Sequence, residues 1–292
     1  MANLKEVRTR IASVSSTQQI TSAMKMVSAA KFRRAQNAIM GMRPYASQLN
    51  AIISDIGIDD GVLTAYHEAR PINSALLIVV TSNKGLCGAF NSNVIKEASS
   101  RLQYFRSKGC KSVRMITIGK RGSEFFAKQE GLVAAAYDDI LDNPSFDAIS
   151  TICDGVMESF CNKEYDHIEL VYNQFKNSLT QILSTEKFLP VVSGEGKTEN
   201  GERYERNDYI FEPGKETILK EMIPLTLRSH FYRVILDSLA AEHGARMTAM
   251  QKATDNATEL LKELRLSYNK ARQAAITNEI IEIVSGSEAL KG

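Results

Sequence analysis

Residues 75–93 read ALLIVVTSNKGLCGAFNSN, an apolar run that leads into a glycine-containing loop and then into a helical pattern. Six apolar residues in succession are typical of a strand that is buried on both faces of a parallel sheet. A strand that passes through glycines and a lysine into a helix is also the arrangement of a phosphate-binding loop. The stretch therefore raises the question of whether the chain binds a nucleotide here.

The order of residues in this loop disfavours a nucleotide site. A Walker A loop ends in Gly-Lys-Ser/Thr, whereas Lys84 precedes Gly85 and Gly88 here, and the dinucleotide pattern GxGxxG is reduced to GxxG. A second candidate, Ser193–Thr198 (SGEGKT), has Val191 where the first glycine of the motif belongs, and a turn in place of a helix follows it. We interpret the first loop as a tight strand-to-helix turn without direct nucleotide binding.

Other catalytic and metal-binding patterns are missing as well. The four cysteines form no CxxC pair, the four histidines form no HExxH or HxH group, and no GxSxG elbow occurs. We therefore expect no catalytic, cofactor or metal site, and free thiols as in a reducing cytoplasm. A reactive thiol at Cys87 beside Lys84 is the alternative to a buried structural cysteine.

The middle of the chain, residues 70–215, alternates strand-like and helical patterns. Strands are expected at 76–81, 113–119 and 168–175, with helices between them at 92–107, 121–130 and 144–161. Asn143 is the expected N-cap of the last helix, with Pro144 in its first turn. Alternation of this kind predicts a central open α/β sheet domain, Rossmann-like and mainly parallel. Two short strands, 180–184 and 187–192, are expected to add to its edge in antiparallel orientation.

The two ends of the chain, residues 1–57 and 220–286, read as long helices. Leu4, Val7, Ile11 and Val14 recur at helical spacing, and Pro44 predicts a kink or break. From Pro224 to Val284 a heptad register persists, rich in small residues, and a helix of this length would extend about 90 Å. A domain of about 145 residues is only about 40 Å across. We therefore predict that the two helices pair as a long antiparallel coiled coil.

Charge is concentrated at the N-terminus. Residues 1–43 contain eight basic residues and one acidic residue, although the whole chain has a net charge of +2. The segment is either a solvated helix face or a surface for an acidic partner. Nucleic acid is a poor candidate for that partner, because only Phe32 and Tyr45 supply aromatic rings in this region. No apolar run reaches the length of a membrane span, and the N-terminus lacks a signal-peptide core.

Four stretches in order along the chain resemble one family. They are residues 11–31 (IASVSSTQQITSAMKMVSAAK), the loop Thr81–Asn91, residues 246–256 (RMTAMQKATDN) and residues 266–279 (LSYNKARQAAITNE). The pattern from Ile276 to Gly286 also fits, with a departure at Ser287, where alanine is usual. Over its whole length the chain resembles the gamma subunit of F-type ATP synthases.

The resemblance implies a non-catalytic subunit of a proton-transporting enzyme complex. In that family the helix pair turns inside a ring of three alpha and three beta subunits, and the α/β domain sits with the epsilon subunit on the membrane ring of c subunits. The rotor couples ion flow through the c ring to conformational change at the beta-subunit catalytic sites, during ATP synthesis or hydrolysis. A peripheral location on the cytoplasmic side of a bacterial inner membrane is implied, and the inserted cysteine pair of chloroplast relatives is missing.

The same resemblance assigns contact residues. Arg246 and Gln273 match positions that bond to a catch loop of beta, Thr277 and Glu279 lie in the same zone, and Met24 matches a position facing an acidic beta loop. Lys84 and Cys87 are expected near the lower rim of beta. Tyr209 and Glu212 are expected at the c ring and epsilon. The competing hypotheses are a nucleotide-binding α/β enzyme with helical arms, and a nucleic-acid-binding coiled coil.

Overall fold

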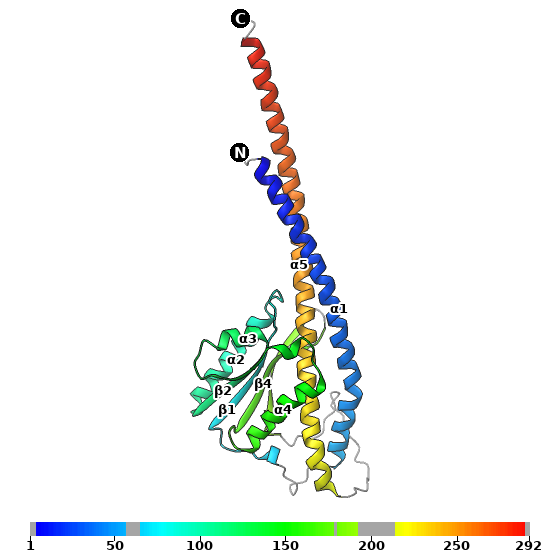
Figure 1. The fold of residues 1–292 in the computed structure, drawn as a ribbon, viewed down its shortest axis with the longest axis vertical. Helices are drawn as coiled ribbons and strands as arrows, with labels where there is room; N and C mark the ends of the chain where they lie inside the picture. The colour runs from blue at the N-terminus through cyan, green and yellow to red at the C-terminus, as the bar shows by residue number, and fades with distance from the viewer. Residues whose placement is uncertain (1–3, 57–64, 178–179, 192–213, 290–292) are drawn as a thin grey trace. The chain divides into compact units, whose positions relative to one another are not determined.

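A computed structural model describes residues 4–56, 65–177, 180–191 and 214–289 (Figure 1). The chain divides into two compact units, which we call the sheet unit (residues 29–246) and the helix-pair unit (residues up to Ser28, and from Met247 onward). Two long helices, α1 (Leu4–Ile56) and α5 (Lys215–Ala289), each contribute to both units. Long terminal helices and a central sheet confirm the predicted fold class.

The described part of the sheet unit contains one five-stranded sheet. Its strands lie in the order β3-β2-β1-β4-β5, with β3, β2, β1 and β4 parallel and β5 antiparallel to β4. Their bounds are β1 Ser74–Val80, β2 Ser112–Ile118, β3 Val133–Tyr137, β4 His167–Phe175 and β5 Gln181–Leu189. The antiparallel edge strand confirms the prediction, but it is one strand where two short ones were expected, and β3 was not predicted.

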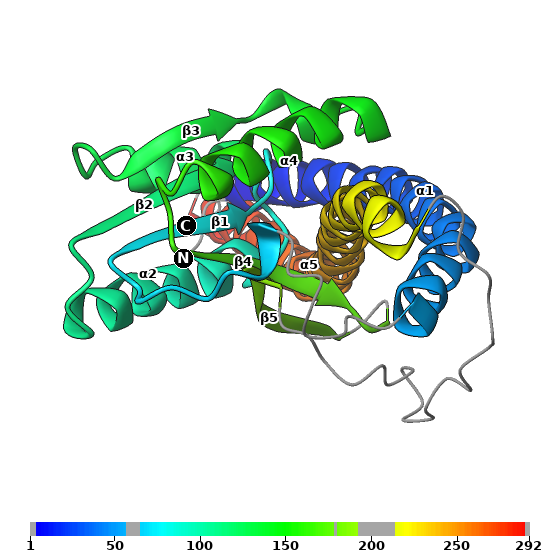
Figure 2. The same ribbon diagram turned by 90° about the horizontal axis from the view of Figure 1, so that it is seen from below.

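Helices cover both faces of this sheet. They are α2 (Phe90–Ser107), α3 (Lys120–Phe126) and α4 (Phe146–Cys161), with short 3-10 helices at Ala65–His67 and Asp139–Leu141. Residues 75, 77 and 79 of β1 pack in one core with α2 and the end of α3, and residues 76, 78 and 80 pack in the other with α4 and α5. Figure 2 shows α2 and α4 on opposite sides of the sheet. Burial on both faces explains why β1 is apolar without alternation.

Two local predictions from the sequence are wrong. The N-cap of α4 is Ser145, whose hydroxyl accepts a hydrogen bond from the Ala148 N–H at 3.3 Å. The cap therefore lies two residues after the expected Asn143, and the helix starts at Phe146. α1 continues through Pro44, so the break expected there is wrong, and the kink stays a prediction.

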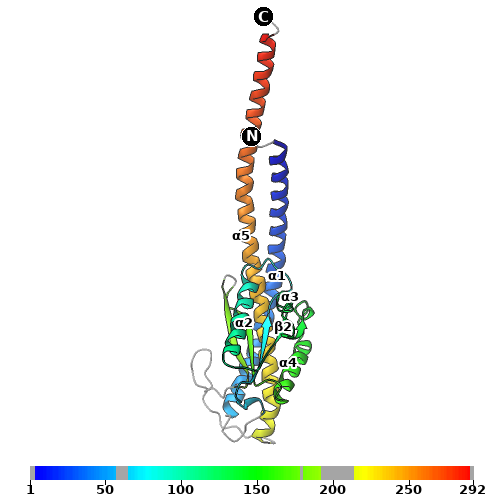
Figure 3. The same cartoon turned by 90° about the vertical axis from the view of Figure 1, so that its left-hand side faces the viewer.

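In the helix-pair unit the described parts of α1 and α5 run antiparallel (Figure 3). The Thr21 hydroxyl lies 2.8 Å from the Thr254 hydroxyl, and Gln18 Nε2 donates to Thr258 Oγ1 at 2.7 Å. Within the stretch of α5 for which the sequence predicts a heptad register, Met250, Ala257 and Leu261 are buried in this unit. From residue 276 to residue 288 α5 is exposed throughout.

No helix in the described part of the chain is both long enough and apolar enough to cross a membrane.

Candidate functional site

The loop after β1, residues 81–89, lies where an open α/β sheet usually holds its ligand. β1 connects to β2 through α2 on one face, and β3 connects to β4 through α4 on the other face. The direction of the chain's progress across the sheet therefore reverses between the neighbours β1 and β4. In folds of this class, ligands bind outside the carboxyl ends of the strands at such a reversal.

Apolar side chains of the chain itself fill this position. Ala241 and Ala245 of α5 pack against Cys87 and Phe90, together with Phe175 at the end of β4. Cys87 and Phe90 are only 2% and 4% exposed. The helix α5 thus lies beside the loop, in the place where nucleotide-binding proteins of this architecture bind their ligand.

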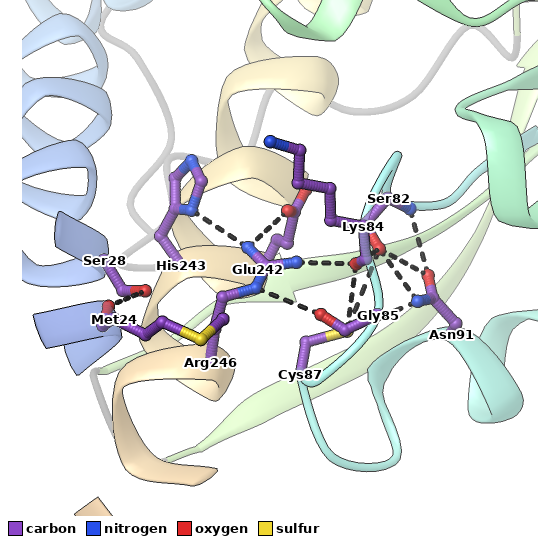
Figure 4. A network of polar contacts seen from close by, with 10 residues as sticks. All are labelled: Met24, Ser28, Ser82, Lys84, Gly85, Cys87, Asn91, Glu242, His243 and Arg246. Carbon is purple, nitrogen blue, oxygen red and sulfur yellow. Dashed lines mark hydrogen bonds and ion pairs between the residues drawn. The ribbon is translucent and has the colours of Figure 1, made fainter. Parts of the chain in front are cut away.

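The loop also presents the wrong polarity for a phosphate. Arg246 of α5 donates from Nη2 to the Lys84 carbonyl oxygen at 2.6 Å and from Nε to the Gly85 carbonyl oxygen at 3.2 Å (Figure 4). A phosphate cradle offers backbone N–H groups, whereas carbonyl oxygens attract a cation. The carbonyl oxygens of this loop are arranged to bind the guanidinium of Arg246.

Each nitrogen of the Arg246 guanidinium has a partner. Nη1 donates to Glu242 Oε1 at 2.6 Å and lies 3.3 Å from His243 Nδ1. Burial raises the pKa of the Glu242 carboxyl, while the attraction of the guanidinium opposes that change. Burial lowers the pKa of His243 to about 4, so the imidazole is neutral at pH 7. Because arginine can only donate, the neutral Nδ1 accepts the bond from Nη1.

A second set of hydrogen bonds fixes the base of the loop. The Ser82 N–H donates to Asn91 Oδ1 at 3.0 Å, and the Ser82 hydroxyl donates to the Lys84 carbonyl oxygen at 2.7 Å. Asn91 Nδ2 lies 3.3 Å from Cys87 Sγ. Burial raises the pKa of the Cys87 thiol. The thiol is therefore protonated at neutral pH, which favours the structural reading of this cysteine over the reactive one.

The structure brings three of the predicted contact residues together. Lys84, Cys87 and Arg246 meet in the sheet unit, where Lys84 is exposed and the other two side chains are buried. Cys87 and Arg246 therefore face the interior of this unit, and Lys84 faces solvent.

The remaining predicted residues fall elsewhere. In the helix-pair unit Met24 is half-buried and its carbonyl accepts the Ser28 hydroxyl at 2.8 Å. Also in this unit, α5 exposes three of them: Gln273, Thr277 and Glu279. Tyr209 and Glu212 lie outside the described residues.

Sequence reasoning missed four residues of the Arg246 site, namely Ser82, Asn91, Glu242 and His243. A signal existed for two of them, because Glu242 and His243 precede Arg246 by four and three residues on one helix, and both spacings place side chains on one face. Ser82 and Asn91 became visible only when the fold placed the loop against α5.

Among the described residues, no cluster of three or more His, Cys, Asp or Glu side chains could hold a metal ion. The sheet unit has the architecture of a nucleotide-binding domain, but its own helix lies in the ligand position. The helix-pair unit is an antiparallel coil with an exposed helical end. These features define a class of protein that joins a small open α/β domain to a long antiparallel helix pair.

Comparison with known proteins identifies the family. A family model described as ATP synthase matches residues 3–290. The ATP synthase gamma chain of Flavobacterium johnsoniae is 52% identical over the full length of both chains, and that of Cytophaga hutchinsonii is 50% identical over 99% of both. The chain belongs to the ATP synthase gamma-chain family.

Solved structures agree with this assignment. A chain of the mitochondrial ATP synthase central stalk and c ring of Tetrahymena thermophila is 27% identical, with a TM-score of 0.60, and the match covers 80% of this chain and 99% of that one. A chain from the Euglena gracilis mitochondrial ATP synthase in rotational state 3 matches over 98% of this chain and 94% of its own, with a TM-score of 0.68. Its 20% identity supports the fold alone.

Proposed function

We propose that the chain is a non-catalytic rotor that couples ion flow through a membrane c ring to conformational change at the beta-subunit catalytic sites. The observation that carries this proposal is the bare end of α5. Residues 276–288 are all exposed, and five of them are large and apolar: Ile276, Ile280, Ile281, Ile283 and Val284. Exposed apolar surface of this extent indicates a partner that covers it.

The partners that fit are three alpha and three beta subunits around the helix pair. In this arrangement beta meets Met24, Gln273, Thr277 and Glu279 in the helix-pair unit. Exposed amide, hydroxyl and carboxylate groups on one stretch of helix suit polar contacts that form and break as the rotor turns. The basic residues near the start of α1 suit an acidic partner surface.

The sheet unit contributes a second contact with beta at the loop that contains Lys84 and Cys87. Lys84 is exposed at the loop, and the proposed partner group is a carboxylate. Arg246 belongs to the same contact, although its side chain faces inward. The epsilon subunit and the c ring are proposed to meet Tyr209 and Glu212, which makes the chain peripheral to the inner membrane of a bacterium, on its cytoplasmic side.

Nucleotide chemistry then belongs to beta. Support comes from the ligand position of the sheet, which Ala241 and Ala245 fill, and from the loop that turns its carbonyl oxygens toward Arg246. An asymmetric rotor acts by making different contacts with the three beta subunits, which shifts each of them toward a different conformation.

Reconstitution with alpha and beta subunits tests the proposal. The full chain should enter an alpha–beta ring in a 1:3:3 ratio and support ATP-driven ion pumping when the membrane sector is added. The double variant Ile280→Ser/Ile281→Ser should weaken capture at least tenfold. A control double variant, Lys262→Ser/Glu263→Ser, changes exposed polar residues of the same helix and should bind normally. Micromolar ATP binding by the isolated chain, or no capture by the ring, would contradict the proposal.

A further inference from the structure

The loop that holds Lys84 carries backbone strain at its tip. Leu86 has φ 62°, a left-handed conformation that is unfavourable for any residue with a Cβ. Its side chain is 63% exposed. This conformation is unfavourable for a leucine and persists only where neighbouring structure enforces it. An apolar side chain held outward at this cost points to a functional position for the tip.

The Arg246 guanidinium is the link that holds this tip to α5. Its bonds to the Lys84 and Gly85 carbonyl oxygens fall on the two residues directly before Leu86. On the other side of the tip, Cys87 is buried against Ala241 and Ala245. Leu86 is therefore fixed from both sides, by a charge-assisted pair before it and by apolar packing after it.

Arg246 has little capacity left for a partner protein. Its side chain is 9% exposed, and its donors already reach two carbonyl oxygens, the Glu242 carboxylate and His243. A direct bond to another subunit would require the guanidinium to leave these acceptors, and would leave the buried Glu242 carboxylate unpaired.

We propose that Arg246 is a positioning residue for the beta-subunit contact: it clamps the Lys84–Cys87 loop so that Leu86 and Lys84 project toward the partner, and it does not touch the partner itself. The inference rests on the proposed function, and it replaces a direct role of Arg246 with an indirect one. The loop then presents the apolar side chain of Leu86 beside the ammonium of Lys84. The complementary surface on the beta subunit is an apolar pocket bordered by carboxylates.

The clamp needs a guanidinium and not merely a positive charge. Three nitrogens in one rigid plane reach two adjacent carbonyl oxygens and a carboxylate together. A lysine ammonium is a single point and cannot span these acceptors. Arg246→Lys should therefore retain the loop only partly.

Alkylation of the cysteines in the purified full chain tests the clamp, with each cysteine read separately by peptide mass spectrometry. Cys87 reports opening of the loop, and Cys153, fully buried in the α4 core, reports opening of the whole sheet unit. Arg246→Ala should accelerate labelling of Cys87 at least tenfold while Cys153 stays protected. The labelling rate of Cys87 in Arg246→Lys should lie between the rates of that variant and the parent. If Arg246→Ala does not fold, Arg246→Lys is compared with the parent in its place.

Two effects other than loop opening could change the labelling of Cys87: the lost charge of Arg246, and the loss of any partly buried arginine. The guanidinium lowers the pKa of the Cys87 thiol, so losing its charge alone would slow alkylation, and acceleration therefore reports opening of the loop. Arg101→Ala removes a different partly buried arginine of the sheet unit, paired with Glu169, and should leave Cys87 protected. Unchanged labelling of Cys87 in both Arg246 variants would overturn the proposal.

A double-mutant cycle separates an indirect role from a direct one. Affinity for the alpha–beta ring is measured for Arg246→Ala, Leu86→Ala and their combination. If Arg246 acts through the loop, the combined loss should equal the larger single loss, whereas multiplied losses would show a direct contact and overturn the proposal. Failure of the parent chain to enter the ring would refute the proposed function, and the clamp would still be judged by the labelling of Cys87.

Discussion

The sheet unit and the helix-pair unit are built from the same two long helices, but their interiors differ. In the sheet unit α5 buries large side chains completely, such as Leu219 and Phe231, within a core that also contains strands and α4. In the helix-pair unit the same helix buries Ala257 and Leu261, and its centre contains a threonine pair. Two helices alone enclose little volume. The chain's own stability therefore resides mainly in the sheet unit, and the helix pair depends on what surrounds it.

The largest expected effect comes from one substitution made at two places on α5. Leu219→Ala removes a fully buried side chain and should cost about 4 kcal/mol, whereas Leu261→Ala should cost about 2 kcal/mol, because a two-helix seam can close over the gap. Urea unfolding, with the sheet unit and the helix pair followed by separate probes, measures both. Equal losses would mean that the helix pair is packed as tightly as the sheet unit.

Adding a methyl group at a glycine should change stability in opposite directions in the two units. Gly119 has φ 103°, and a Cβ there would lie 2.4 Å from the Thr81 carbonyl oxygen, so Gly119→Ala should destabilise the sheet unit by about 3 kcal/mol. A Cβ at Gly286 meets nothing within 4 Å, and Gly286→Ala should stabilise the end of α5 by about 1 kcal/mol through helix propensity. Thermal unfolding and helical circular dichroism would show the two signs. The same sign for both would refute the contrast.

Acid should weaken the sheet unit selectively. Its Glu186 on β5 is bonded by His230 Nε2 at 3.1 Å and by the Tyr172 hydroxyl at 2.6 Å, and the bond from His230 is the main cause that lowers the pKa of Glu186 to about 2. A lowered folded-state pKa gives stability that is present above the unfolded value of 4.5 and is lost as the pH falls toward 2.

Glu186→Gln should therefore remove on the order of 2 kcal/mol of pH-dependent stability between pH 5 and pH 2. The measurement is the urea midpoint of both proteins at several pH values. The described carboxylates of the helix-pair unit are all exposed, so its helicity should change little over this range. Parallel pH profiles of the parent and the variant would contradict the assignment.

The smallest effect concerns the threonine pair in the helix-pair unit. Thr21→Val alone should cost about 1 kcal/mol, because the Thr254 hydroxyl loses its partner in a partly buried seam. Thr21→Val/Thr254→Val should recover most of that loss, since two apolar groups of the same shape replace the pair. Thermal melting of the helix pair in the parent, the two single variants and the double variant gives the coupling energy of the two hydroxyls. A double loss equal to the sum of the single losses would show that the two hydroxyls do not interact.

The sequence predicted the parts of the fold that are dominated by burial. β1, β2 and β4 were found because each contains consecutive buried residues with mostly apolar side chains, and α5 was found because its heptad pattern is continuous. β3 was missed because VAAAY is short, mostly exposed and rich in alanine, which favours no strand. β5 was divided in two because Ser184 and Glu186 interrupt its apolar pattern. Only the fold shows that the Glu186 carboxylate accepts hydrogen bonds from both the Ser184 hydroxyl and the Tyr172 hydroxyl.

For the candidate site, the sequence singled out residues but not how their side chains are arranged. Resemblance to the family marked Lys84, Cys87 and Arg246 as contact residues. It could not show that Arg246 faces its own loop, because residues 84 and 246 are far apart in sequence and meet only through the packing of α5 on the end of β1. The strain at Leu86 is likewise invisible in a sequence, since leucine has no preference for a left-handed conformation.

The packing of α5 on the sheet also sets an order of events during synthesis. The α4 face of the sheet is completed by residues between Leu219 and Leu239, which leave the ribosome after β5, the last strand among the described residues, has ended at Leu189. At about 5–20 residues per second, this face stays uncovered for about 2–10 s in every new chain. Ribosome-bound chains arrested before Leu219 emerges should be cut by protease in the sheet unit, and chains arrested after Leu239 emerges should resist it. Equal resistance in both would show that the sheet folds without α5.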